Sequence, residues 1–212
     1  MAFANLADQA HLWIRHNVAE PFREPSGGMF PSLWIGDHFF ANRSSSIKAQ
    51  LKRGDIIVFT VAREGDHVFP ADERPDLPRE HFVKRIIGLP GDSIEFRGRG
   101  VVLNGLPISH ESLGDTVEPS SGRPVEVLRE TLDGRSYMIG WTPDHPLGNF
   151  SQIVVPPSRL FLVGDNRNAS FDSRFWGTVR EEEVIGIATH IYYSRDPRSG
   201  QIHWSRIGRL VQ

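Results

Sequence analysis

Lys84 is the residue of this sequence whose setting most directly suggests chemistry. It lies within the apolar run Phe-Val-Lys-Arg-Ile-Ile at residues 82–87, which is typical of a buried strand. If the lysine shares a strand face with Phe82 and Ile86, its amine is desolvated and its pKa falls below the usual value of about 10.4. A neutral amine can act as a general base near neutral pH. The alternative is a structural lysine that extends from a sheet edge into solvent.

A dense set of hydrogen-bonding side chains follows another apolar run, at residues 160–163. Residues 164–177 contain two aspartates, two asparagines, two arginines and two serines. A polar loop beside a buried strand must satisfy its hydrogen bonds internally, so we expect Asp172 to pair with Arg174 and Ser170 to orient a neighbouring amine. A calcium loop is excluded, because the required glycine is absent and the twelfth position is Trp176 rather than a carboxylate.

The third candidate is the loop at residues 25–33, which combines two prolines, two serines and the adjacent glycines Gly27 and Gly28. Glycine lets another backbone approach closely, and the prolines restrict the backbone on either side. These features suit a site where a peptide lies against main-chain donors. Taken alone, the same composition is also typical of an ordinary surface turn.

Composition excludes several classes of function. The chain has 212 residues and a net charge of −2, which argues against a nucleic-acid partner. It contains no cysteine, which excludes disulfides, thiolate metal sites and a cysteine nucleophile. No HExxH spacing, phosphate loop or Gly-x-Ser-x-Gly elbow is present, so we expect no metal and no cofactor. No apolar window is long enough for a transmembrane helix, and the N-terminus lacks the pattern of a secretory signal peptide.

The elements that must position these residues are mostly strands. Short apolar runs separated by turns predict strands at 56–61, 82–87, 93–96, 101–103, 160–163 and 184–193. Residues 1–20 carry apolar side chains at three- and four-residue steps and predict a helix, either packed on its own domain or lying at a membrane interface. The predicted fold class is therefore mainly β.

Four stretches, in the right order, resemble the bacterial type I signal peptidases, the serine–lysine proteases that remove signal peptides from exported proteins. They are Pro-Ser-Gly-Gly-Met-Phe-Pro-Ser-Leu at 25–33, Arg-Gly-Asp-Ile-Ile-Val-Phe at 53–59, Val-Lys-Arg-Ile-Ile-Gly-Leu-Pro-Gly-Asp at 83–92, and Gly-Asp-Asn-Arg to Asp-Ser-Arg-Phe-Trp-Gly at 164–177. The resemblance implies a fold of coiled antiparallel sheets. Its parts would be a short N-terminal helix or anchor remnant at 1–21, a catalytic-type core at 22–103 and 155–212, and an inserted β-rich lobe at 104–154.

The resemblance also implies roles for individual residues. Lys84 matches the general base, and Ser170 matches the serine that orients its amine. Ser26 matches the serine whose hydroxyl joins the main-chain N–H of position 28 in the oxyanion hole. The family's nucleophile is the second serine of Pro-Ser-Gly-Ser-Met. The matching position here is Gly28, which has no oxygen to attack a carbonyl.

Supporting and substrate-binding groups follow from the same resemblance. Asp172 and Arg174 match a structural ion pair, with Arg85 as further support. The residues expected to bind substrate are Glu24, Pro25, Met29, Leu33, Phe82 and Val83. The substrate would lie extended, with small side chains one and three residues before the cut.

The partners that the resemblance implies are preproteins that carry signal peptides, and a membrane surface that faces residues 18–35 and 204–210. The implied location is the outer, periplasmic face of the bacterial inner membrane. Family members have a membrane anchor before the region that aligns with Phe22, whereas this sequence has none. We therefore expect either a truncated chain or a soluble relative.

Glu24 is a second departure from the family, which usually has an apolar residue at this position. A carboxylate in the pocket for small side chains is costly to bury unless it is paired. Lys84 is an available partner. Such pairing would raise the pKa of the lysine and remove it as a base.

These residues lead to two main hypotheses about function. The first is a signal peptidase I family protein that recognises signal peptides, with endoproteolytic activity absent or reduced because of Gly28. Residual cleavage would then need Ser26, Ser32 or a water activated by Lys84 as the nucleophile. The alternative is a non-catalytic homologue that binds signal-peptide-like or pilin-like segments as an assembly factor. A third reading, a relative of the self-cleaving repressors, is disfavoured by residues 164–177 and by the lack of a DNA-binding region.

Overall fold

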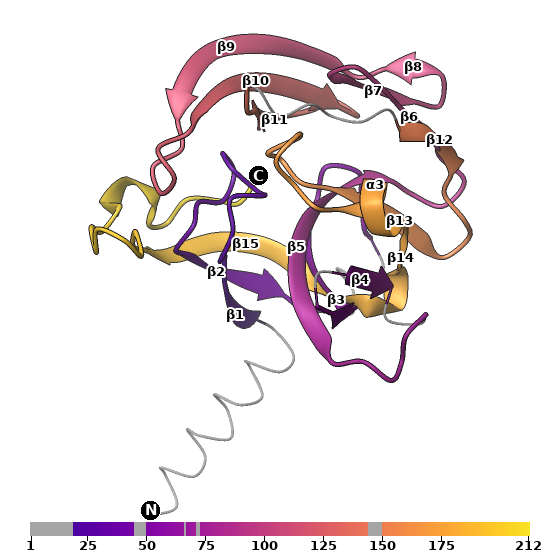
Figure 1. The fold of residues 1–212 in the computed structure, drawn as a ribbon, viewed down its shortest axis with the longest axis horizontal. Coiled ribbons are helices and arrows are strands. Elements are labelled where there is room, and N and C mark those ends of the chain that lie inside the picture. Colours follow the sequence, from indigo (N-terminus) through magenta and orange to yellow (C-terminus); the bar gives the residue numbers. More distant parts are fainter. Residues whose placement is uncertain (1–18, 45–49, 66, 71–72, 144–149) are drawn as a thin grey trace, which may run out of the picture.

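The computed structural model describes residues 19–44, 50–65, 67–70, 73–143 and 150–212, which form three antiparallel sheets (Figure 1). The large sheet has the strand order β1-β2-β15-β3-β5-β13-β14, with β4 paired to β3. Its strands are β1 (Ala19–Arg23), β2 (Asp37–Asn42), β3 (Ile56–Glu64), β4 (His67–Pro70), β5 (Arg79–Gly88), β13 (Arg159–Val163), β14 (Val179–Arg180) and β15 (Val184–Ser194). The prediction of a mainly β fold is confirmed.

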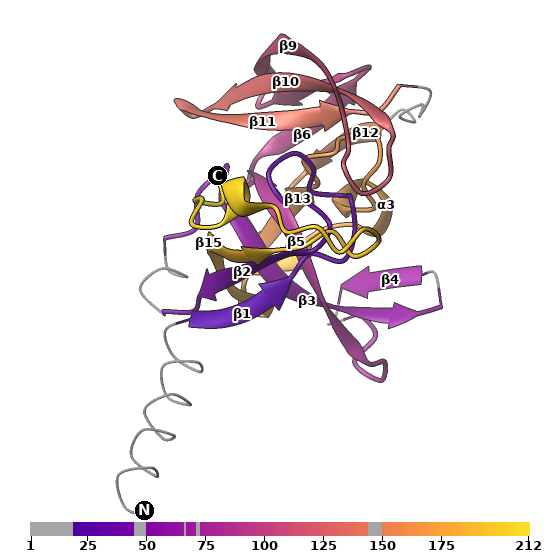
Figure 2. The ribbon, with the colours of Figure 1, turned by 90° about the vertical axis from the view of Figure 1, so that its left-hand side faces the viewer.

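Two smaller sheets lie together on one side of the large sheet (Figures 1 and 2). Their strand orders are β12-β6-β7-β8 and β11-β10-β9. The strands are β6 (Ser93–Arg97), β7 (Gly100–Leu103), β8 (Leu106–Pro107), β9 (Ser109–Val117), β10 (Pro124–Leu132), β11 (Arg135–Trp141) and β12 (Phe150–Val154). Buried side chains of both sheets, such as Ile94 and Leu128, share one apolar cluster with Phe161 of β13.

The boundary of this second layer differs from the lobe that the sequence suggested at 104–154. Strands β6 and β7 hydrogen-bond to β8 and β12 rather than to the large sheet, so the layer begins at Ser93. The local pattern of residues 93–103 predicts two strands correctly. It does not indicate which sheet these strands join, because strand pairing depends on tertiary contacts.

The segment predicted as an N-terminal helix, residues 1–20, falls mostly outside the described residues, which begin at Ala19. The end of the expected N-terminal unit at 1–21 is a strand, because Ala19, Glu20 and Pro21 belong to β1. This strand pairs with β2 and places Phe22 opposite Phe39, with the two rings stacked at 6.1 Å. The helix prediction is therefore wrong for these last residues.

Strands β3 and β5 form the apolar centre of the large sheet. Ile56, Ile57, Val58 and Phe59 are all buried, which explains why β3 reads as a continuous apolar run rather than an alternating one. Ile57 lies opposite Lys84 of β5. The alternation along β5 sends Val83 into one apolar cluster and Ile86 into another.

Candidate active site

The loop between β1 and β2 carries Gly28 and is held by residues that follow β13. Figure 2 shows this indigo loop rising from the large sheet toward the β9–β11 sheet. The backbone N–H of Asn166 donates to the carbonyl of Gly28 at 3.1 Å, and its side-chain amide donates to the carbonyl of Gly27 at 3.1 Å. Asn166 therefore fixes the orientation of two successive peptide units.

Gly28 faces three of the predicted catalytic groups. A Cβ at this position would lie 3.5 Å from the Nζ of Lys84, 3.5 Å from the Oγ of Ser170 and 3.7 Å from the Oγ of Ser26. These are ordinary van der Waals separations, and the backbone of Gly28 lies outside the left-handed region. A serine side chain would thus fit here without strain, beside the lysine amine.

Lys84 is buried, with 5% of its surface exposed. Its Nζ donates to the backbone carbonyl of Val83 at 2.9 Å and lies 5.9 Å from the centre of the Phe82 ring. Burial lowers the pKa of Lys84, and this effect outweighs the attraction of Glu24, Asp172 and Asp165. The lysine therefore has the protonation behaviour that a general base requires.

Ser170 also lies next to Gly28, and its hydroxyl is buried with no hydrogen-bond partner among the described residues. Its position depends on Gly164, where the chain passes so close to Ser170 that a side chain would collide with it. The backbone N–H of Gly164 donates to Asp172 at 2.9 Å. The unpaired hydroxyl is thus left in reach of whatever group occupies position 28.

Asp172 and Arg174 form the ion pair that the sequence predicted. The Nε and one terminal nitrogen of Arg174 donate to the two carboxylate oxygens of Asp172, each at 2.7 Å, and both side chains are buried. Asp172 also accepts from the backbone N–H of Arg174 and so caps the short helix α3 (Ser173–Trp176). The pair therefore holds the end of the loop that carries Ser170.

Arg85 points away from Lys84, as the strand alternation requires. It binds both carboxylate oxygens of Asp165 at 2.7 Å, and it donates to the carbonyl of Gly54 at 2.6 Å and to the hydroxyl of Ser32 at 3.2 Å. Its guanidinium also stacks on Tyr137 at 3.8 Å. Arg85 thus connects β5 to the loop after β13 and to the β9–β11 sheet.

Glu24 has a partner that the sequence did not indicate. Its Oε1 accepts the backbone N–H of Ser26 at 2.9 Å and the hydroxyl of Ser26 at 2.8 Å, while its Oε2 is buried with no hydrogen-bond partner in the part of the chain that the structure describes. Among the described residues, no ion pair joins Glu24 to Lys84, and burial raises the pKa of Glu24. The pKa of Lys84 is lowered rather than raised, so the expected loss of the base through pairing with Glu24 does not occur.

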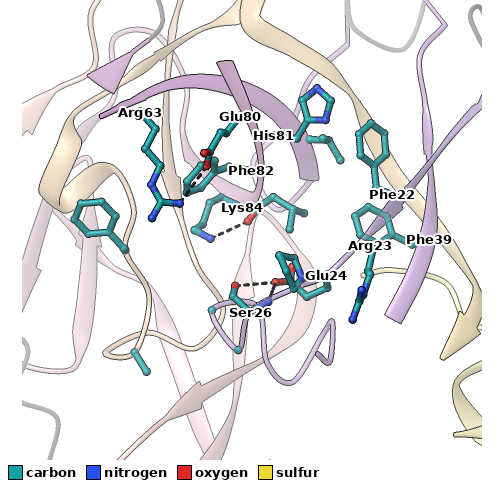
Figure 3. A pocket seen from close by; sticks show the side chains of 17 residues that line it. Phe22, Arg23, Glu24, Ser26, Phe39, Arg63, Glu80, His81, Phe82 and Lys84 are labelled. Atoms are coloured by element: carbon teal, nitrogen blue, oxygen red, sulfur yellow. Dashed lines mark hydrogen bonds and ion pairs between the residues drawn. The ribbon is translucent and has the colours of Figure 1, made fainter. Parts of the chain in front are cut away.

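A cavity of about 400 Å³ opens beside these groups (Figure 3). Of the predicted substrate-binding residues, Glu24, Pro25, Phe82 and Val83 line it, together with Ser26, Gly28 and Lys84. Met29 and Leu33 do not line it. Both are fully buried in the apolar cluster under the loop, because their side chains point into the core beneath it.

Several cavity residues were missed from the sequence. They come from strands β1, β2, β3 and β5 and from the loop after β13, and they are Phe22, Arg23, Phe39, Val58, Arg63, Glu80, His81, Ala169 and Phe171. Figure 3 shows the paired Arg63 and Glu80 together near Phe82, and Phe22 beside Phe39. Val58, Ala169 and Phe171 lie within stretches that the resemblance covers, but the direction of their side chains depends on tertiary packing. The other six lie outside those stretches and reach the cavity through the pairing of their strands.

A second missed feature is a buried ion pair that joins the two layers. Arg167 donates from two nitrogens to the carboxylate of Glu130 on β10, and Tyr137 of β11 donates to the same carboxylate at 2.5 Å. The backbone N–H of Gly140 donates to the carbonyl of Asp165 at 2.8 Å, and that of Arg167 donates to the carbonyl of Gly140 at 2.8 Å. The β9–β11 sheet thereby helps to position the loop that carries Asn166 and Ser170.

Comparison with known proteins places this geometry in a family. The model of the family described as signal peptidase, peptidase S26, matches residues 2–193. A signal peptidase I of Leptolyngbya laminosa is 32% identical over 84% of this chain and 70% of its own length. A signal peptidase I of Pseudomonas fluorescens is 29% identical over 94% of this chain and 74% of its own length.

One solved signal peptidase structure is similar in sequence to part of this chain. The crystal structure of a signal peptidase I from Enterococcus faecalis V583 is 24% identical over 65% of this chain and 95% of that one, with a TM-score of 0.35. In the part of the chain that the structure describes, no helix is long and apolar enough to cross a membrane. With the family model covering most of the sequence, the chain belongs to the S26 family of signal peptidases.

Proposed function

We propose that this protein binds the cleavage region of signal-peptide-bearing preproteins in the cavity beside Lys84, and that its own endopeptidase activity is absent or severely reduced. The observation that carries the proposal is the space at Gly28. A side chain there would contact the Lys84 amine and the Ser170 hydroxyl at 3.5 Å. The base and its neighbour are in place, and the oxygen that would attack the peptide carbonyl is missing.

In this proposal the remaining residues keep the roles of a serine–lysine site. Lys84 would take the proton of a hydroxyl at position 28, and Ser170 would orient the amine. The backbone N–H of Gly28 would donate to the oxyanion. Asp172 and Arg174 would hold the loop that carries Ser170. Without a hydroxyl at position 28 no acyl-enzyme can form there, and residual cleavage would need Ser26, Ser32 or a water activated by Lys84 as the nucleophile.

The deciding experiment restores the missing oxygen. The purified wild type and the Gly28→Ser variant are incubated with a preprotein whose leader ends in Ala-x-Ala. Gly28→Ala and Gly28→Ser/Lys84→Met serve as controls. We expect Gly28→Ser to cleave at least about 100-fold faster than the wild type and both controls. A wild type that cleaves as fast as Gly28→Ser would refute the proposal of lost activity.

The same samples test the alternative of a non-catalytic homologue that binds signal-peptide-like or pilin-like segments as an assembly factor. Binding of a labelled leader peptide is measured for the wild type and Gly28→Ser. Tight binding by both proteins with cleavage by neither would favour the binding role. In that case Glu24→Ile is added to the variant before the enzymatic reading is abandoned, since Glu24 lines the same cavity.

In this proposal the cavity lies close to a membrane surface, on the outer face of the bacterial inner membrane. Support comes from exposed apolar side chains in the region expected to face the membrane, where Trp204 is 72% and Leu210 56% exposed. Phe40 and Tyr192 form a further partly exposed stack, with ring centres 4.5 Å apart. When the protein is sedimented with phospholipid vesicles, we expect the wild type in the pellet with the vesicles and a Trp204→Ser/Leu210→Ser variant in the supernatant.

A further inference from the structure

The hydroxyl of Ser26 donates a hydrogen bond to Glu24 in this structure. Both the backbone N–H and the hydroxyl of Ser26 donate to the same carboxylate oxygen, at 2.9 and 2.8 Å. The backbone of Glu24 is itself fixed, because its N–H donates to Asp37 and its carbonyl accepts from Gly36. Figure 3 shows Ser26 turned toward this carboxylate, with Lys84 on the other side of the hydroxyl.

A serine hydroxyl has a single hydrogen to donate. Here one carboxyl oxygen of Glu24 accepts both the hydroxyl and the backbone N–H of Ser26. Glu24 is 1% exposed, so its carboxyl group is shielded from water, while Ser26 itself is exposed. The hydrogen that would stabilise an oxyanion beside position 28 is therefore held by Glu24.

Glu24 also borders the cavity in which a tetrahedral intermediate would form. Its second carboxyl oxygen, Oε2, is buried and has no hydrogen-bond partner among the described residues.

We propose that Glu24 is a positioning residue that withholds the Ser26 hydroxyl from the oxyanion hole, and that it restrains catalysis independently of Gly28. This inference rests on the proposed function, because it assigns the oxyanion hole to Ser26 and the N–H of position 28. It predicts that the Gly28→Ser variant remains a slow enzyme until Glu24 is also replaced. The effect is on turnover, since the bond to Glu24 does not involve the bound peptide.

The test is a double-mutant cycle in the Gly28→Ser background with the preprotein substrate, using Glu24→Ile, Ser26→Ala and both together. Glu24→Ile should raise kcat by about 10- to 100-fold, and Ser26→Ala should remove that gain. With Glu24 present, Ser26→Ala should lower kcat less than about threefold. Glu20→Gln, which changes a carboxylate of β1 outside the cavity, should leave kcat unchanged.

A readout without catalysis keeps the inference testable if a variant is inactive. In the wild-type background, the melting temperatures of Glu24→Ile, Ser26→Ala and the double variant should be non-additive by at least about 3 °C, because the hydroxyl bond exists only when both residues are present. Additive shifts, or a kcat gain from Glu24→Ile that survives Ser26→Ala, would overturn the inference. Cleavage by no variant, with non-additive melting temperatures, would refute the serine–lysine site of the proposed function and favour its binding-only alternative, but would leave the Glu24–Ser26 bond established.

Discussion

Gly164 offers a sharp test of how the site is packed. A Cβ at this position would lie 2.5 Å from the carbonyl oxygen of Gly28, and closer still to the Cβ and Oγ of Ser170. Of these three atoms only the hydroxyl oxygen can rotate away. The other two belong to the backbone or are attached to it, so Gly164→Ala requires the two loops to separate.

The expected cost follows from this geometry. Overpacking a well-packed core costs about 1–3 kcal/mol, and the upper end applies here because backbone must move. We therefore expect Gly164→Ala to lose about 3 kcal/mol of unfolding free energy, or about 6–12 °C in melting temperature for a chain of this size. Gly28→Ala is the matched control, because no neighbour lies within 3.5 Å of its Cβ. It should gain about 0.4–1 kcal/mol from the reduced entropy of the unfolded chain.

Urea unfolding of the wild type and the two variants measures this difference directly. In the Gly28→Ser background, Gly164→Ala should also abolish the restored cleavage, because it pushes Ser170 away from Lys84. The packing argument is refuted if Gly164→Ala and Gly28→Ala lie within about 1 kcal/mol of each other.

Two further predictions concern buried charges. Arg167→Met should cost about 3–5 kcal/mol by leaving the Glu130 carboxylate buried without its partner, and adding Glu130→Leu should recover most of the loss. This account is contradicted if the losses of unfolding free energy in the two single variants simply add in the double variant. For Lys84, whose pKa is lowered by burial, the cleavage rate of Gly28→Ser should rise with pH and level off below the ordinary lysine value of 10.5. Because the unfolded chain binds the proton that folded Lys84 releases, wild-type stability should also rise with pH up to 10.5, and Lys84→Met should lack that rise. A rate that levels off only above 10.5 would contradict the lowered pKa.

Features that depend on neighbouring residues could be predicted from the sequence. The apolar run around Lys84 predicted a strand and left open whether the amine is desolvated or extends into solvent; the strand is present and Lys84 is buried. Asp172 and Arg174 lie two residues apart, which is close enough for their pairing to be read from the chain. Each prediction depended on a local period or a short spacing, which the chain imposes whatever its tertiary context.

Features that depend on the direction of a side chain could not be predicted in this way. Glu130 and Arg167 are 37 positions apart and meet only because two layers pack together. Met29 and Leu33 belong to the same motif as Gly28, yet their side chains enter the core rather than the cavity. Lys84 was an available partner for Glu24, but no hydrogen bond joins the two among the described residues, and the carboxyl group of Glu24 accepts from the two donors of Ser26.

Position 28 shows both what the sequence alone determines and what depends on the tertiary structure. The sequence by itself determines that no oxygen is available there, because glycine has no side chain and no fold can supply one. Only the tertiary structure decides whether the place for that oxygen survives, since Gly28, Lys84 and Ser170 come from three distant segments. Hydrogen bonds from Asn166, the Asp172–Arg174 pair and the pairing of β3 with β5 hold those segments at van der Waals distance. The space beside the lysine is therefore a product of packing, and it admits a Cβ at ordinary van der Waals distances from Lys84 and Ser170.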